Sequence, residues 1–283
     1  MASMLMRSAR AKGAVVLAGL LILAVAILWG LVIFVWSVLA NTGAGGGAGG
    51  RPSVSPAITA SSSPSPPPPS SAGVALESAQ NALAAVPMLE VIPEAALPQP
   101  LARSTAGSPA TAPLTLPGAT DTTQLVPTGY PRTPAGAVAQ LAAIDALAFK
   151  DLNPFNPRAA YDWAALPAAV PYEAWTPQVG VSAVLAAVGE LRGSTGLTST
   201  WTLTHAQIKG VLDDGNFVVA CVLGEFDANY RASVRAGVGD CQRMVWQQGR
   251  WRIGPGAQPA FAPSTWPGSA ECVRAGWQEV PNA

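Results

Sequence analysis

The chain has few charged residues, a single histidine and only three cysteines among its 283 residues. Charged side chains make up 11% of the sequence, and 16 basic residues balance 16 acidic ones, so the formal net charge at pH 7 is zero. A neutral chain with no basic segment beyond its first residues has no broad electrostatic attraction to nucleic acid or to an anionic membrane surface. We therefore expect no nucleic-acid partner.

The scarcity of histidine and cysteine also argues against metal chemistry. His205 is the only histidine, and the spacing of the three cysteines is not that of a zinc site, so no metal and no cofactor is expected. Two carboxylates, Glu225 and Asp227, alternate at the outgoing end of a predicted strand. They form either an acid/base pair in a cleft or an ordinary solvated strand end. The second interpretation is simpler, and no catalytic residue is assigned: the chain is expected not to be an enzyme.

A long apolar run is the clearest feature that is present. Ala14–Ala40 contains no ionisable side chain, and as a helix it spans roughly 40 Å, enough to cross a hydrocarbon core of ~30 Å. Arg7, Arg10 and Lys12 precede it, and no charge follows before Arg51. The positive-inside rule then places residues 1–13 in the cytoplasm and everything after the span outside it.

A cleaved signal peptide is the alternative for the same run, because Val38-Leu39-Ala40 is an acceptable cleavage site. Signal cores are about 7 to 15 apolar residues long, much shorter than this run, so a single-pass anchor at residues 14–40 is favoured. Both alternatives put the C-terminal part in the same extracytoplasmic, oxidising compartment.

Residues 41–128 are rich in glycine, proline, serine and alanine. Glycine runs are flexible and proline runs are extended, and neither buries enough apolar surface to offset the entropy of ordering. The composition therefore predicts a disordered tether, with at most a transient helix at Ala75–Leu89. Residues 129–283 are then left as the folded extracytoplasmic domain.

Helix starts in this domain are indicated by a polar residue followed by proline, a pair that suits the N-cap and the first helical position. The pairs are Thr133-Pro134, Asn156-Pro157 and Thr176-Pro177. The predicted helices are Pro134–Lys150, Pro157–Leu166 and Pro177–Arg192. A last helix is expected at Ser269–Val280, with Val273 and Trp277 facing inward.

Between Gly193 and Pro255 the pattern changes from helical to alternating, which predicts strands. They are expected at Thr200–Val211, Phe217–Phe226, Ser233–Trp246 and Arg250–Gly254. A two-residue turn at Gln248-Gly249 places Trp246 opposite Trp251 and Met244 opposite Ile253. The second strand is apolar at both parities, so it should be central and covered on both faces. The fold class is α+β, with helices packed on a curved antiparallel sheet.

Two of the cysteines lie on consecutive predicted strands whose connecting turn centres near Arg231. Cys221 and Cys241 should therefore face each other, at an α-carbon distance of about 4.5 Å if the site is not hydrogen-bonded. We expect a disulfide between them. Separate buried thiols, or pairing of either cysteine with Cys272, remain open alternatives.

Two segments of the domain, Gly129–Val138 (GYPRTPAGAV) and Gly249–Gly256 (GRWRIGPG), resemble an uncharacterised family of actinobacterial bitopic membrane proteins associated with conjugative elements. The resemblance implies a cone-shaped domain of the nuclear transport factor 2 type, similar to extracytoplasmic domains of type IV secretion assembly subunits. Such domains are scaffolds, and the family lends no catalytic residues.

The expected function is that of a non-enzymatic, membrane-anchored envelope protein that scaffolds other envelope proteins, in a conjugative or type IV secretion-like apparatus. Homo-oligomerisation is left open. Two alternatives remain. In one, the cone binds or turns over a small apolar ligand, using Glu225 or Asp227 and His205. In the other, the protein is an accessory subunit of a lipid-import complex.

Overall fold

The computed structural model describes residues 71–101, 112–187, 198–230 and 232–281. The expected anchor at residues 14–40, the cytoplasmic residues 1–13 and the first part of the expected tether lie outside these ranges. Within the described ranges, no helix is both long and apolar enough to cross a membrane.

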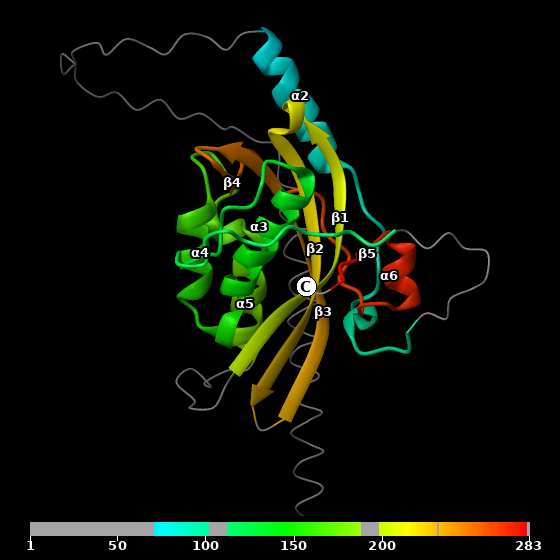
Figure 1. Ribbon diagram of the computed structural model, residues 1–283. Helices are drawn as coiled ribbons and strands as arrows, with labels where there is room; N and C mark the ends of the chain where they lie inside the picture. The colour runs from blue at the N-terminus through cyan, green and yellow to red at the C-terminus, as the bar shows by residue number, and fades with distance from the viewer. Residues whose placement is uncertain (1–70, 102–111, 188–197, 231, 282–283) are drawn as a thin grey trace, which may run out of the picture.

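A single five-stranded antiparallel sheet is the centre of the domain, and its strand order is β4-β3-β2-β1-β5. Three long strands twist around one another in its middle (Figure 1). The short β4 and β5 form its edges. The strands are β1 (Thr198–Leu212), β2 (Phe217–Tyr230), β3 (Ala232–Gln247), β4 (Arg250–Ile253) and β5 (Gln278–Glu279). The predicted α+β class with one antiparallel sheet is confirmed.

Tight turns set the register of the sheet. Gln248 and Gly249 both have positive φ, as a two-residue hairpin loop requires, and the predicted pairing of Trp246 with Trp251 and Met244 with Ile253 is confirmed. The two indole rings lie edge to face with centroids 5.4 Å apart. At the same end of the sheet, the 3-10 turn η5 (Asp213–Gly215) connects β1 to β2, and the Trp246 N–H donates to the Asn216 carbonyl at 2.8 Å.

Three helices cover one face of the sheet: α3 (Pro134–Ala148), α4 (Asn156–Ala164) and α5 (Thr176–Ala187) (Figure 1). The hydroxyl oxygen of Thr133 accepts a bond from the Gly136 N–H at 3.1 Å, so the first predicted cap is confirmed. The second is wrong. Helix α4 has no side-chain cap, and the Asn156 amide donates instead to the carbonyl of Lys150, which fixes the turn before the helix.

Strand β2 is buried on both faces, as predicted for a central strand. Its even-numbered residues join α3, α4 and α5 in the larger core, and its odd-numbered residues form the opposite core. The first set is Val218, Ala220, Val222 and Phe226; the second is Phe217, Val219, Cys221 and Leu223.

The opposite face is covered by segments from both ends of the domain. They are α2 (Ser71–Ala85), the 3-10 helix η1 (Pro93–Ala96), residues 254–268 and α6 (Ala270–Arg274). The Ala260 N–H donates to the Ala84 carbonyl at 2.9 Å, and the Trp266 N–H donates to the Ala95 carbonyl at 2.6 Å. Helix α6 lies on this side of the sheet (Figure 1), where its Cys272 packs in a cluster with Cys221 and Leu223.

The N-terminal boundary expected at residue 129 is therefore too late. Residues 71–101 and 112–128 were assigned to the tether, yet Ala84, Ala95, Ala96 and Val126 are all buried. Although this segment is rich in proline and alanine, a few of its side chains, such as Ala84 and Val126, pack against apolar side chains of the sheet. The folded part begins no later than Ser71.

The last predicted helix is also corrected. Helix α6 has only five residues, because Gly276 adopts a φ of 79° and turns the chain into the edge strand β5. Val273 is 58% exposed, contrary to expectation, whereas Trp277 is 4% exposed and faces inward as predicted.

Candidate functional site

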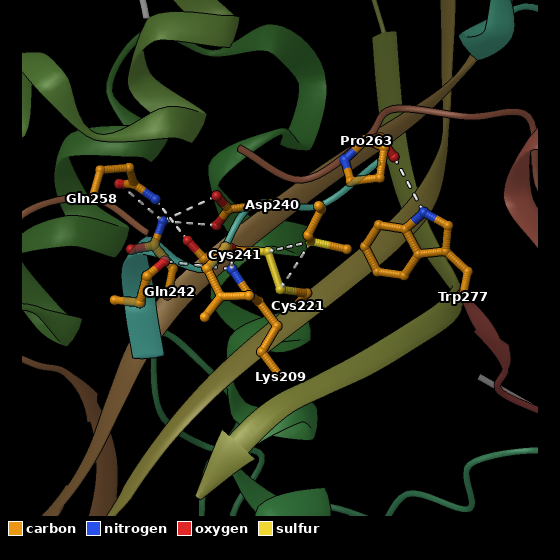
Figure 2. Close-up of a disulfide and its surroundings, with 11 residues drawn as sticks. Lys209, Cys221, Asp240, Cys241, Gln242, Gln258, Pro263 and Trp277 are labelled. Carbon is orange, nitrogen blue, oxygen red and sulfur yellow. Dashed lines mark hydrogen bonds between the residues drawn. A yellow bond between two sulfur atoms is a disulfide. The ribbon is translucent and has the colours of Figure 1, made fainter. Parts of the chain in front are cut away.

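The predicted disulfide between Cys221 and Cys241 is present, with α-carbons 4.1 Å apart. The two cysteines are direct register partners on β2 and β3. Their side chains point to the face opposite α3, α4 and α5, and Figure 2 shows the bond in its surroundings.

Apolar groups enclose this disulfide. The sulfur of Met88, from the segment between α2 and η1, lies 3.9 Å from the sulfur of Cys221 and 3.6 Å from that of Cys241. Trp277 packs in the same cluster and donates its indole N–H to the carbonyl of Pro263 at 3.2 Å (Figure 2). Cys272 is a buried free thiol in this cluster, and burial raises its pKa. A protonated, enclosed thiol is a poor nucleophile.

The carboxylates singled out by the sequence lie at the exposed end of β2. Glu225 accepts a hydrogen bond from Nε of Arg235 at 2.6 Å, and Asp227 lies 3.9 Å from the same nitrogen. The guanidinium of Arg235 also stacks over the ring of Trp266, 5.2 Å from its centroid. A partly exposed ion-pair network of this kind fits the solvated strand end, and neither carboxylate lines the cavity under α5 that the described residues form.

His205 lies on β1 opposite Glu279 of β5. It is half-buried, and burial lowers its pKa, an effect that the charge of Glu279 partly offsets. In the part of the chain that the structure describes, no group of three or more histidine, cysteine or acidic residues is arranged to hold a metal ion.

Two other carboxyl groups are buried in the interior and influence each other electrostatically. Asp145 of α3 is fully buried, and Asp240 of β3 is 1% exposed. Asp240 has a side-chain donor: Nε2 of Gln242 lies 3.0 Å and 2.9 Å from its two oxygens. The neighbouring Cys241 N–H and Thr176 hydroxyl also favour its ionised form and act to lower its pKa. Figure 2 shows the amide of Gln242 against this carboxylate. Neither oxygen of Asp145 has a partner among the described residues.

The electrostatics of the pair follow from this burial. Removal from water raises the pKa of Asp240 to about 6, although its hydrogen bonds oppose the rise. The pKa of Asp145 is raised well above its ordinary value, first by burial and then by the charge of Asp240. Both carboxyl groups are therefore harder to ionise than an exposed aspartate.

A small apolar cavity of about 50 Å³ adjoins this pair. Thr176 lines the cavity, and so does Gly239, the neighbour of Asp240 in β3. The rest of the lining is apolar and includes Phe149, Leu152, Val181 and Phe226. Pockets for drug-sized ligands measure about 300 to 1,000 Å³, so the interior is largely filled by side chains.

Sequence reasoning missed both aspartates, although helical spacing contained a signal for one. Asp145 lies four residues after Leu141 and three before Ala148, on the helix face that carries these two buried side chains. Asp240 has the parity of Met244, which faces the helices. An acidic residue at a position that helical spacing predicts to be buried therefore indicates a carboxyl group in the core.

Comparison with protein-family models, with curated proteins and with solved structures finds no match to this chain.

Proposed function

We propose that this protein is a non-enzymatic envelope protein, anchored by residues 14–40, whose extracytoplasmic domain binds other envelope proteins in an apparatus of the conjugative or type IV secretion kind. The anchor, the topology and the resemblance of residues 129–138 and 249–256 motivate this proposal from the sequence side. Under it, the α+β domain is a cone of the nuclear transport factor 2 type.

The small internal space of the described domain, a cavity of about 50 Å³, is the observation that carries the proposal. Both faces of the sheet are covered by the chain itself, and the space under α3 and α5 is filled by large side chains such as Phe149, Trp201 and Phe226. A domain with so little internal space offers its outer surface for recognition. Proteins bind one another through such surfaces, often through exposed aromatic anchors.

The disulfide is consistent with this location. Bonds of this kind persist in oxidising compartments, which is where the proposed topology places Cys221 and Cys241. A small-ligand function receives less support, because Glu225 and Asp227 are engaged by Arg235 and His205 lies on the edge pair of β1 and β5.

Photo-crosslinking in native membranes tests the proposal. A photoreactive residue is placed at Phe155, whose side chain is 77% exposed between η2 (Lys150–Leu152) and α4, in the full chain. We expect mass spectrometry to identify at least one envelope protein joined at that position. The same substitution at the exposed turn residue Gln248 serves as the matched control for chance encounters. Adducts with lipid alone, or identical adducts from both positions, would contradict the proposal.

A further inference from the structure

The connecting segment, residues 87–91 between α2 and η1, lies over the disulfide but is bonded to the sheet only beyond its two ends. Before it, the ammonium of Lys209 on β1 donates to the Val86 carbonyl. After it, the Trp266 N–H donates to the Ala95 carbonyl at 2.6 Å. Within the described part of the chain, no hydrogen bond reaches the backbone of the connecting segment itself. Side-chain packing must therefore hold its middle in place.

Met88 provides that packing. Its sulfur lies 3.6 Å from the sulfur of Cys241 and 3.9 Å from that of Cys221. Among the described residues, it is the one partly buried apolar side chain that packs against the cluster around the disulfide. Leu89 and Ile92, which follow it, are 43% and 67% exposed. The contact between the connecting segment and the disulfide cluster is thus one thioether side chain.

The two methionines of the described ranges differ in their access to solvent. Met244 is fully buried in the larger core, whereas Met88 is half-buried under an exposed stretch of chain. An oxidant has to touch the sulfur atom in order to react with it. Met88 should therefore react long before Met244 while the domain is folded.

We propose that Met88 is an oxidation site, and that its conversion to the sulfoxide by hydrogen peroxide releases the connecting segment from the disulfide. The thioether sulfur attacks one peroxide oxygen, and an S–O bond forms as the O–O bond breaks. The second oxygen leaves as water and carries both peroxide protons. The sulfur loses two electrons, and the peroxide gains them. This site is additional to the proposed envelope function and does not depend on it.

The surroundings of Met88 suit a thioether and do not suit a sulfoxide. The sulfoxide oxygen is a strong acceptor, but the cluster around it is apolar and includes Leu223. The indole N–H of Trp277 already donates to the Pro263 carbonyl at 3.2 Å (Figure 2), and Cys272 offers only a weak S–H donor. A polar oxygen buried without a donor is unfavourable. The oxidised side chain therefore moves to water, and the disulfide loses its cover.

The experiment treats the folded full chain, in detergent micelles, with hydrogen peroxide and then removes the excess with catalase. Peptide mass mapping measures the sulfoxide at Met88 and at Met244. A glutamate-specific protease that cuts after Glu90, within the connecting segment, measures its release. We expect Met88 to be oxidised first and cleavage after Glu90 to become at least about tenfold faster. Thiol labelling in mild reductant should show the disulfide reduced faster by a similar factor.

Met88→Leu is the matched variant, because leucine keeps the apolar volume and has no sulfur to oxidise. Its cleavage rate should stay close to that of the untreated wild type and should not respond to peroxide. An equal peroxide response in this variant would assign the effect to another residue and overturn the proposal.

Two results on the wild-type chain alone would also overturn it, whether or not the variant folds. One is equal oxidation of Met88 and Met244 in the folded chain. The other is complete oxidation of Met88 with unchanged rates of cleavage and of disulfide reduction, because the sulfoxide would then be accommodated without movement of the segment.

Discussion

Loss of the disulfide should cost the domain a predictable amount of stability. Cys221 and Cys241 are 20 residues apart in sequence, and closing a loop of that length lowers the entropy of the unfolded chain by an amount worth about 3 kcal/mol at 25 °C. Reduction of the wild-type chain removes this constraint while it leaves all side-chain carbon atoms in place. The unfolding constant should then rise by about a hundredfold.

The surroundings of the bond predict how it responds to reagents. Both sulfurs are buried under Met88 and its neighbours. Reductant should therefore reach them only when the segment between α2 and η1, which carries Met88, detaches or the whole domain unfolds. Alkylation with mass mapping should find no reactive cysteine in the folded chain. In urea without reductant, only Cys272 should react, and with reductant all three cysteines should.

The assay combines that thiol count with urea unfolding of the full chain in detergent, with and without reductant. Three reactive thiols in urea without reductant would refute the bond itself. A reduced chain as stable as the oxidised one would refute the loop-entropy argument while it left the pairing intact.

Three further predictions concern single residues. Gly224→Ala should destabilise the domain by roughly 1 to 3 kcal/mol in thermal unfolding, because the added Cβ would lie 2.1 Å from the indole of Trp201; Gly118→Ala, with open space around it, is the control and should be neutral. Met88→Ala should loosen the segment over the disulfide by roughly 1 to 2 kcal/mol and speed its limited proteolysis; an unchanged cleavage rate would contradict the packing role. The rise of the Asp240 pKa from 3.8 to about 6 corresponds to about 3 kcal/mol of stability that is present below pH 4 and lost as the pH rises through 6. Urea unfolding of wild type and Asp240→Asn between pH 4 and 7 measures that loss, and parallel profiles would contradict it.

Local rules were sufficient to predict the centre of the sheet. A two-residue turn fixes every pair that follows it, so Gln248-Gly249 determined the contact between Trp246 and Trp251. The same reasoning about the β2–β3 turn placed Cys221 opposite Cys241. In these strands the turn and the apolar pattern agree, which is why the register could be derived without the structure.

Contacts between distant segments could not be derived in the same way. Met88 and Ala95 lie in a proline- and alanine-rich stretch, and that stretch packs because it covers an apolar face of the sheet that would otherwise be exposed to water. Asp145 and Asp240 are likewise 95 positions apart, on a helix and a strand whose relative placement no local pattern fixes, so their mutual electrostatic influence could not be predicted. Helix α6 was predicted too long because the positive φ of Gly276 was not recognised as its end.

The topology of the anchored chain tests the account most directly. A paired reporter, one enzyme active only outside the cytoplasm and one active only inside, is fused after Ala283 in the full chain. The account predicts activity of the outside reporter alone, together with an oxidised Cys221–Cys241 bond in the same cells. Activity of the cytoplasmic reporter, with both cysteines recovered as thiols, would contradict the envelope location and the function proposed for the domain.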